Sequence, residues 1–178
     1  MLKYLKKKQK IGILGGSFDP PHLGHLEISK FAIKKFKLNY LIWVVTKQNP
    51  FKKKTYFKLN SRISLCKKIV KNEKQKIKIE FLDKKINSSK TYHLIKYLKD
   101  TYIENKFLFL MGADSFVRFH KWYNWKKIPR ISKIIIFDRT SYSKKALNCV
   151  ASKTLDKRYW KFVNFKKINI SSSKIRKI

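Results

Sequence analysis

Two glycines and two histidines near the N-terminus have the residue types and the spacing to bind a phosphate group. Residues 15–25 read GGSFDPPHLGH, directly after a short apolar run, and an apolar-periodic stretch follows them. The pattern predicts a buried strand that ends in a glycine loop, where the backbone can approach a ligand closely. The helix after the loop offers unpaired N–H groups and a partial positive charge to an anion. His22 and His25 share one face of its first turn, so both can point at that anion.

This loop contains neither a Walker A loop nor a GxGxxG fingerprint, so it indicates a different kind of phosphate site. Gly24 keeps the helix face low between the two histidines, which leaves room for a flat or bulky ligand. The plainer interpretation is a strand–turn–helix connection with two surface histidines. Against it, the chain has only four histidines, and two of them lie in this turn framed by glycine and proline.

A second anion site is predicted where three serines, Ser171–Ser173, precede Lys174 and Arg176. A serine at a helix start is by itself most simply an N-cap, and Ser171 or Ser172 could fill that role. A cation in the first turn of a helix opposes the helix dipole, so the two basic residues make better sense if an anion also binds there. Arg176 is the more informative of the two, because only six of the 45 basic residues are arginine.

Asp114 and Trp122 are candidates for binding a nucleoside. Asp114 follows the apolar run 106–111, so it should lie at the carboxyl edge of a sheet, where a carboxylate can accept hydrogen bonds from ribose hydroxyls. A helix N-cap is an equally good interpretation of this aspartate. Trp122 could stack on a flat heteroaromatic ring, whereas Trp125 is predicted to pack in the core.

Two further segments carry polar groups that could meet a substrate. Thr91 and Tyr92 open a predicted helix and offer hydroxyl and backbone N–H groups. Asn49 and Lys52 follow the apolar run 40–46, where a loop could close over a substrate.

Alternating strands and helices are predicted to hold these residues in place. Strands are expected at 11–14, 40–46, 77–82, 106–111 and 133–137, with a sixth at 161–165, and helices at 23–36, 60–71 and 91–102 and after the GAD at 112–114. Asn60 or Ser61 is the predicted N-cap of the second helix. The alternation implies right-handed crossovers, and hence an α/β, Rossmann-like, doubly wound and mostly parallel sheet with helices on both faces. Ligands bind such sheets beyond the carboxyl ends of the strands, where the strand order reverses.

Size and composition fit one folded domain over residues 1–178. Cys66 and Cys149 lack metal-ligand spacing and indicate free thiols in a reducing compartment. No apolar run is long enough to span a membrane, and the first residues lack the apolar region of a secretion signal, so a cytoplasmic protein is expected. No catalytic triad, carboxylate pair or zinc pattern is visible, and His93 and His120 are interpreted as structural or surface residues.

The net charge of +35 raises the alternative of a nucleic-acid-binding module. Lysines, however, are spread through every segment and accompany abundant isoleucine and asparagine. This distribution indicates a drift in composition rather than a localised binding face.

In combination these motifs resemble those of the HxGH nucleotidylyltransferases, and most closely those of the bacterial nicotinate-nucleotide adenylyltransferases. The shared features are GGSFDPPHLGH, the GAD at 112–114 followed by Trp122, NPFK at 49–52, the TY pair at 91–92 and the terminal ISSSKIR. They occur in this order over nearly the whole chain. HxGH alone would indicate only the superfamily.

The resemblance implies transfer of AMP from ATP to nicotinate mononucleotide, which gives deamido-NAD and pyrophosphate, with Mg²⁺ assisting and without a covalent enzyme intermediate. It implies that His22, His25 and Arg176 are catalytic, with His25 stabilising charge at the reacting phosphate. The implied ATP-binding residues are Gly15, Gly16, Ser17, Phe18, His22, Gly24, His25, Asp114, Ser171, Ser172 and Arg176. The implied residues for nicotinate mononucleotide are Asn49, Lys52, Thr91, Tyr92 and Trp122.

Two other adenylyltransferases share part of this pattern. Phosphopantetheine adenylyltransferases have the glycine loop, HxGH and a similar terminus, but Trp122, the TY pair and the terminal Ile175–Arg176 point away from them. An enzyme that prefers nicotinamide mononucleotide remains open, because acid and amide differ by one charge. The chain also departs from the family at 138–142, where only Arg139 and Tyr142 of the usual Arg-Pro-Gly-Tyr are kept.

Overall fold

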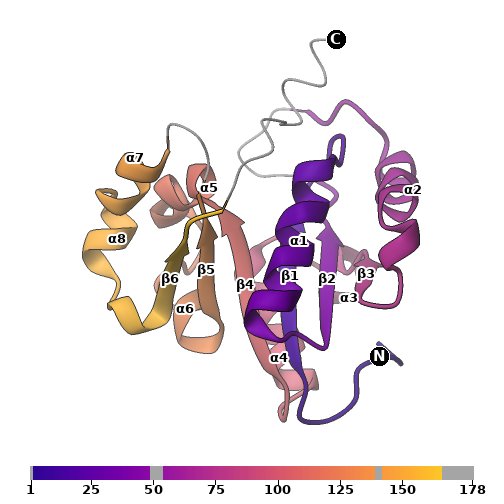
Figure 1. Cartoon of the computed structure of the whole chain (residues 1–178), viewed down its shortest axis with the longest axis horizontal. Coiled ribbons are helices and arrows are strands. Elements are labelled where there is room, and N and C mark those ends of the chain that lie inside the picture. Colours follow the sequence, from indigo (N-terminus) through magenta and orange to yellow (C-terminus); the bar gives the residue numbers. More distant parts are fainter. Residues whose placement is uncertain (1, 49–53, 139–141, 166–178) are drawn as a thin grey trace.

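Within the residues that the computed structural model describes (2–48, 54–138 and 142–165), six strands form one sheet in the order β3-β2-β1-β4-β5-β6 (Figure 1). The strands are β1 (Lys10–Gly16), β2 (Tyr40–Val45), β3 (Ile77–Glu80), β4 (Lys106–Gly112), β5 (Lys133–Phe137) and β6 (Trp160–Val163). Every neighbouring pair of these strands is parallel. The chain builds outward from β1 to β3, and β4 then returns to the other side of β1. The strand order therefore reverses between β1 and β4, which confirms the doubly wound α/β fold.

Helices cover both faces of the sheet (Figure 1). The helices are α1 (Leu23–Phe36), α2 (Leu59–Ile69), α3 (Asp83–Ile86), α4 (Thr91–Thr101), α5 (Ala113–Val117), α6 (Ile128–Ile131), α7 (Ser143–Leu147) and α8 (Val150–Thr154), with single 3₁₀ turns η1 (Lys71–Glu73), η2 (Phe119–Lys121) and η3 (Lys157–Tyr159). Buried residues of α1 and α2 pack on one face, and those of α4 to α8 pack on the other. Successive residues of β2 alternate between the two cores, as the two-residue period of a strand requires. The four inner strands β1, β2, β4 and β5 are buried on both sides in this way, which explains their continuous apolar runs, whereas the edge strands β3 and β6 are only partly buried.

Most of the expected elements are present, and the bounds of α1 and β5 match the predictions. The sixth strand is confirmed at Trp160–Val163. The prediction that Asn60 or Ser61 caps the second helix is wrong: α2 begins at Leu59, with Lys58 at the cap position and no side-chain hydrogen bond there. Contacts from outside the helix organise the chain just before it, as described below. Helices α3 and α6 to α8 were not predicted, because four or five residues are too short to display a helical period.

Both cysteines are free thiols in the interior, as predicted. Burial raises the pKa of the Cys66 thiol to about 12, so this group stays protonated and unreactive at neutral pH. Among the described helices, none has the length and hydropathy to cross a membrane.

Candidate active site

The segment 15–22, which we call the glycine loop, lies at the carboxyl end of β1, next to the point where the strand order reverses. β1 continues through Gly16, so both glycines belong to the end of the strand. No described glycine has a positive φ; the left-handed residue of the loop is Phe18, with φ of 47°. A Cβ at Gly15 would lie 3.6 Å from the ring of Phe109, an ordinary contact. Neither backbone conformation nor internal packing therefore requires glycine at position 15, which is consistent with a close approach by a ligand.

The two histidines begin α1 as predicted and lie against each other. His22 is the N-cap residue and is buried, while His25 occupies the third helical position and is half-buried. Their ring centroids are 3.9 Å apart. The backbone N–H of His22 donates to Nδ1 of His25 at 3.2 Å. Because Nδ1 accepts this bond, the proton of the neutral His25 ring resides on Nε2, which makes Nε2 the donor for an anion.

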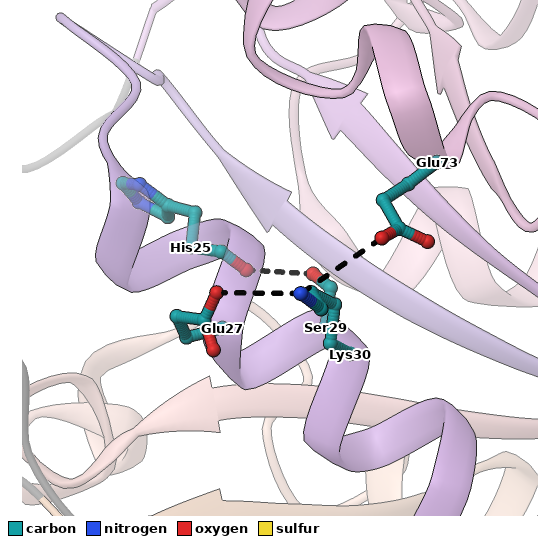
Figure 2. Close-up of polar contacts among 5 residues, drawn as sticks. All are labelled: His25, Glu27, Ser29, Lys30 and Glu73. Atoms are coloured by element: carbon teal, nitrogen blue, oxygen red, sulfur yellow. Dashed lines mark hydrogen bonds and ion pairs between the residues drawn. The ribbon is translucent and has the colours of Figure 1, made fainter.

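A small network supports the turn that carries His25. The Ser29 hydroxyl donates to the carbonyl of His25 at 2.7 Å (Figure 2), and Nε1 of the buried Trp43 donates to Ser29 at 2.8 Å. Phe18 stacks on Trp43 with centroids 4.9 Å apart and also contacts the His25 ring at 4.9 Å. The second strand thus holds both the loop and the first helical turn in place.

One turn further along α1, Lys30 forms ion pairs with Glu27 at 3.8 Å and with Glu73 at 3.9 Å (Figure 2). Their side chains are 35% to 47% exposed, so these long ion pairs contribute little to stability.

Asp114 stands just past the carboxyl end of β4, in the first turn of α5. Gly112 is the N-cap of that helix, so the alternative prediction that Asp114 is the N-cap is wrong. Because β4 is the neighbour of β1, Asp114 lies at the same edge of the sheet as the glycine loop.

The predicted stacking tryptophan is half-buried, at the end of the turn η2. Trp122 contacts Phe119 at 5.3 Å and Phe109 at 6.2 Å between ring centroids, and Phe109 is also the neighbour of Gly15. Trp125 packs against the same core, as predicted. Trp122 therefore combines a core contact with a partly exposed ring close to the glycine loop.

α4 begins at Thr91, as predicted, and the side chains of its first turn contact the residue after Trp122. The ring of Tyr92 lies 6.1 Å from that of Tyr123, and the Lys90 ammonium lies 4.3 Å from the centroid of Tyr123. The start of α4, which carries Thr91 and Tyr92, therefore packs against the residue that follows Trp122. His93 accepts or donates a hydrogen bond with Ser88 at 2.8 Å, which fits a structural histidine.

Several predicted site residues lie outside the described part of the chain: Asn49, Lys52, Ser171, Ser172 and Arg176. Their roles stay predictions.

Three charged residues around the loops were missed from the sequence. Asp19 accepts from two backbone N–H groups before α2, Asp83 accepts from the end of β2, and the buried Arg62 donates to several backbone carbonyls. For Arg62, the sequence signal was that arginine is rare in this lysine-rich chain, so that an arginine is more informative than a lysine.

Comparison with known proteins shows the family of this chain. The sequence profile of the cytidylyltransferase-like family matches residues 13–178. The chain is 49% identical to the probable nicotinate-nucleotide adenylyltransferase of Pelagibacter ubique, over 97% of this chain and 95% of that protein. It is 33% identical to the protein of the same name from Ruegeria, over 94% and 96%. The chain belongs to the nicotinate-nucleotide adenylyltransferase family.

Solved structures in this family share the fold. The Plasmodium falciparum nicotinic acid mononucleotide adenylyltransferase complexed with NaAD matches with a TM-score of 0.74 and 24% identity, over 95% of this chain and 83% of that one. The same enzyme complexed with APC matches with a TM-score of 0.75 and 22% identity, over the same shares. In the present chain, the glycine loop and the HxGH segment therefore lie on a sheet that shares the fold of these solved structures.

Alanine at two glycines of β1 should separate stability from substrate binding. In Gly12→Ala the new Cβ would lie 2.8 Å from Leu38 and 3.2 Å from Leu41, so we expect a loss of about 1–3 kcal/mol of folding stability with an unchanged KM for ATP. Gly15→Ala should fold normally and raise the KM for ATP about tenfold, equivalent to about 1.4 kcal/mol. Thermal melts and ATP titrations of both variants test this pair. A normal KM in Gly15→Ala would remove this glycine from the nucleotide site.

Proposed function

We propose that this protein transfers the AMP group of ATP to nicotinate mononucleotide. The phosphate oxygen of the mononucleotide attacks the α-phosphorus of ATP, and the bond from that phosphorus to the bridging oxygen breaks. Deamido-NAD forms and pyrophosphate leaves with the electron pair. The observation that carries the proposal is the His22–His25 pair at the start of α1, beside the reversal of strand order, in a chain whose close relatives bear this enzyme's name.

The histidines act by holding and neutralising phosphate rather than by covalent catalysis. His25 offers Nε2–H to an oxygen of the reacting phosphate, and the N–H groups at the start of α1 add their positive dipole. Such a transfer needs positioning and charge stabilisation more than a protein nucleophile. Ser171, Ser172 and Arg176 are proposed to bind the pyrophosphate portion, and Arg176 would stabilise its growing charge as the bond breaks.

The two nucleosides are proposed to lie on either side of the reacting phosphates. Asp114 binds the adenosine side of ATP, and the backbone of Gly16, Ser17 and Phe18 lines the nucleotide. Thr91, Tyr92 and Trp122 surround the nicotinate ring, with Asn49 and Lys52 contributing from the loop after β2.

Mg²⁺ is proposed to arrive with ATP, bound mainly by the phosphate oxygens. The donors of the glycine loop are imidazole and N–H groups, which suit an anion, whereas Mg²⁺ prefers oxygen ligands and is commonly held through substrate phosphates. The bound Mg²⁺ would draw charge away from the leaving pyrophosphate.

We further propose that residues 1–178 act as one domain in the cytoplasm.

Pyrophosphate release with ATP and Mg²⁺ tests the acceptor directly. We expect strong preference for nicotinate mononucleotide over its amide and over phosphopantetheine. Preference for phosphopantetheine would keep the HxGH chemistry and overturn the proposed acceptor site. No release with any of the three, from folded protein, would contradict the enzyme and favour the nucleic-acid-binding module, which predicts steeply salt-dependent binding to DNA.

A further inference from the structure

Arg62 is a buried arginine that has no role in the proposed reaction as described above. Its side chain, on α2, is 1% exposed. Nη1 donates to the carbonyls of Ser17 at 2.6 Å and Thr46 at 2.8 Å. Nη2 donates to the carbonyl of Lys47 at 2.8 Å, and Nε donates to that of Phe57 at 3.0 Å. One guanidinium therefore binds the loop after β1, the end of β2 and the chain before α2.

Two carboxylates hold the same segments. Asp19 accepts hydrogen bonds from the backbone N–H groups of Tyr56 and Phe57, both at 2.9 Å. Asp83 accepts from the Thr46 hydroxyl at 2.9 Å and from the Lys47 N–H at 2.8 Å. Burial lowers the pKa of Arg62, while interactions with Asp19, Cys66 and Asp83 oppose this shift. The two carboxylates thus help to keep a buried cation charged.

The segments differ in how many other supports they have. The loop after β1 is also held by the Phe18–Trp43 stack and by the bond between His22 and His25. Of the residues that follow β2, Thr46 also donates its backbone N–H to the carbonyl of Gly16 at 3.0 Å, whereas the hydrogen bonds described above for Lys47 are those with Arg62 and Asp83. Loss of the guanidinium should therefore move Lys47, where the chain leaves β2, more than the glycine loop.

We propose that Arg62 is a positioning residue that sets the spacing between the glycine loop after β1 and the exit of β2 at Lys47. This inference rests on the proposed function, in which ATP binds at the glycine loop and the exit of β2 leads toward the acceptor. The spacing then fixes how the acceptor phosphate lines up with the α-phosphorus. A lysine would not replace the arginine, because its ammonium is a point charge that cannot reproduce the planar fork that these carbonyls bind.

Arg62→Lys is the direct test. Because a misplacement of about 1 Å can cost about 100-fold in rate, we expect kcat to fall ~10- to 100-fold, with a clear rise in the KM for nicotinate mononucleotide and an ATP KM within about threefold of wild type. Kinetics are measured at a temperature where thermal melts show each variant to be folded, and rates are divided by the folded fraction. An inactive wild-type protein would instead contradict the proposed function, so the two failures are distinguishable.

Two further variants separate positioning from simple loss of stability. Val70→Ala removes buried apolar atoms at the other end of α2, and we expect a lower melting temperature with normal kcat and KM values. Asp83→Ala removes, from a partly exposed site, the carboxylate that accepts hydrogen bonds from the Thr46 hydroxyl and the Lys47 N–H. It should raise the KM for the mononucleotide in the same direction as Arg62→Lys, by a smaller factor, which provides the test if Arg62→Lys does not fold. If the acceptor KM is unchanged in Asp83→Ala, or changes equally in Val70→Ala, the inference is wrong.

Discussion

His25→Ala is expected to lower kcat by ~10²–10³-fold or more while the protein remains folded, because one preorganised donor to the charge of the transition state typically contributes that much. The Nε2–H of His25 is the group lost. The fold should survive because the turn keeps its backbone bond from His25 N–H to the His22 carbonyl, and the Ser29 hydroxyl still donates to the carbonyl at position 25.

The measurement is single-turnover formation of deamido-NAD with saturating ATP, together with a thermal melt. Lys30→Ala on the same helix is the matched control, since its exposed ion pairs contribute little and we place it in no step of the reaction. We expect the control to show wild-type turnover. Near-normal turnover in folded His25→Ala would contradict the proposal that this histidine binds the reacting phosphate.

Trp43→Ala is expected to have the largest effect on stability, a loss of about 3–5 kcal/mol. Trp43 is fully buried, stacks on Phe18 and donates to Ser29, so its removal leaves a cavity and frees the loop and the helical turn together. For a chain of this size the melting temperature should fall by roughly 6–20 °C.

Trp43→Phe provides the comparison for this variant. A phenyl ring keeps an aromatic partner for Phe18, but it loses the N–H donor to Ser29 and leaves a smaller cavity than alanine does, so we expect a loss smaller than that of Trp43→Ala. Melts followed by circular dichroism measure both variants. Equal losses in the two would show that the hydrogen bond, rather than the stacked ring, carries the stability.

The β1–α1 unit was readable from the sequence because local signals agree there. The apolar run, the glycines and the helical spacing each indicate the same strand–loop–helix, and the structure places α1 at the predicted residues. The buried strands were equally readable, since burial on both faces leaves an uninterrupted apolar run. The physical role of Gly12 was not readable, because it depends on Leu38, which packs over it from the end of α1.

The support of the loops could not be predicted, because it depends on tertiary proximity. Arg62, Asp19 and Asp83 lie far apart in the sequence and come together only when β1, β2, α2 and α3 are packed. Apart from the Thr46 hydroxyl, the partners described above are backbone N–H and C=O groups, which nearly every residue type offers, so no motif marks them. The same packing explains the wrong cap of α2, because Asp19 binds the N–H groups that precede the helix.

The four hydrogen-bond acceptors of Arg62 are all main-chain oxygens, and this affects which substitutions the protein can accept during evolution. The guanidinium follows the path of the chain and is indifferent to which side chain each position carries. Residues such as Lys47 and Phe57 can therefore be replaced while their carbonyls stay where Arg62 needs them. A change to lysine at such a position therefore leaves the hydrogen bond from Arg62 in place.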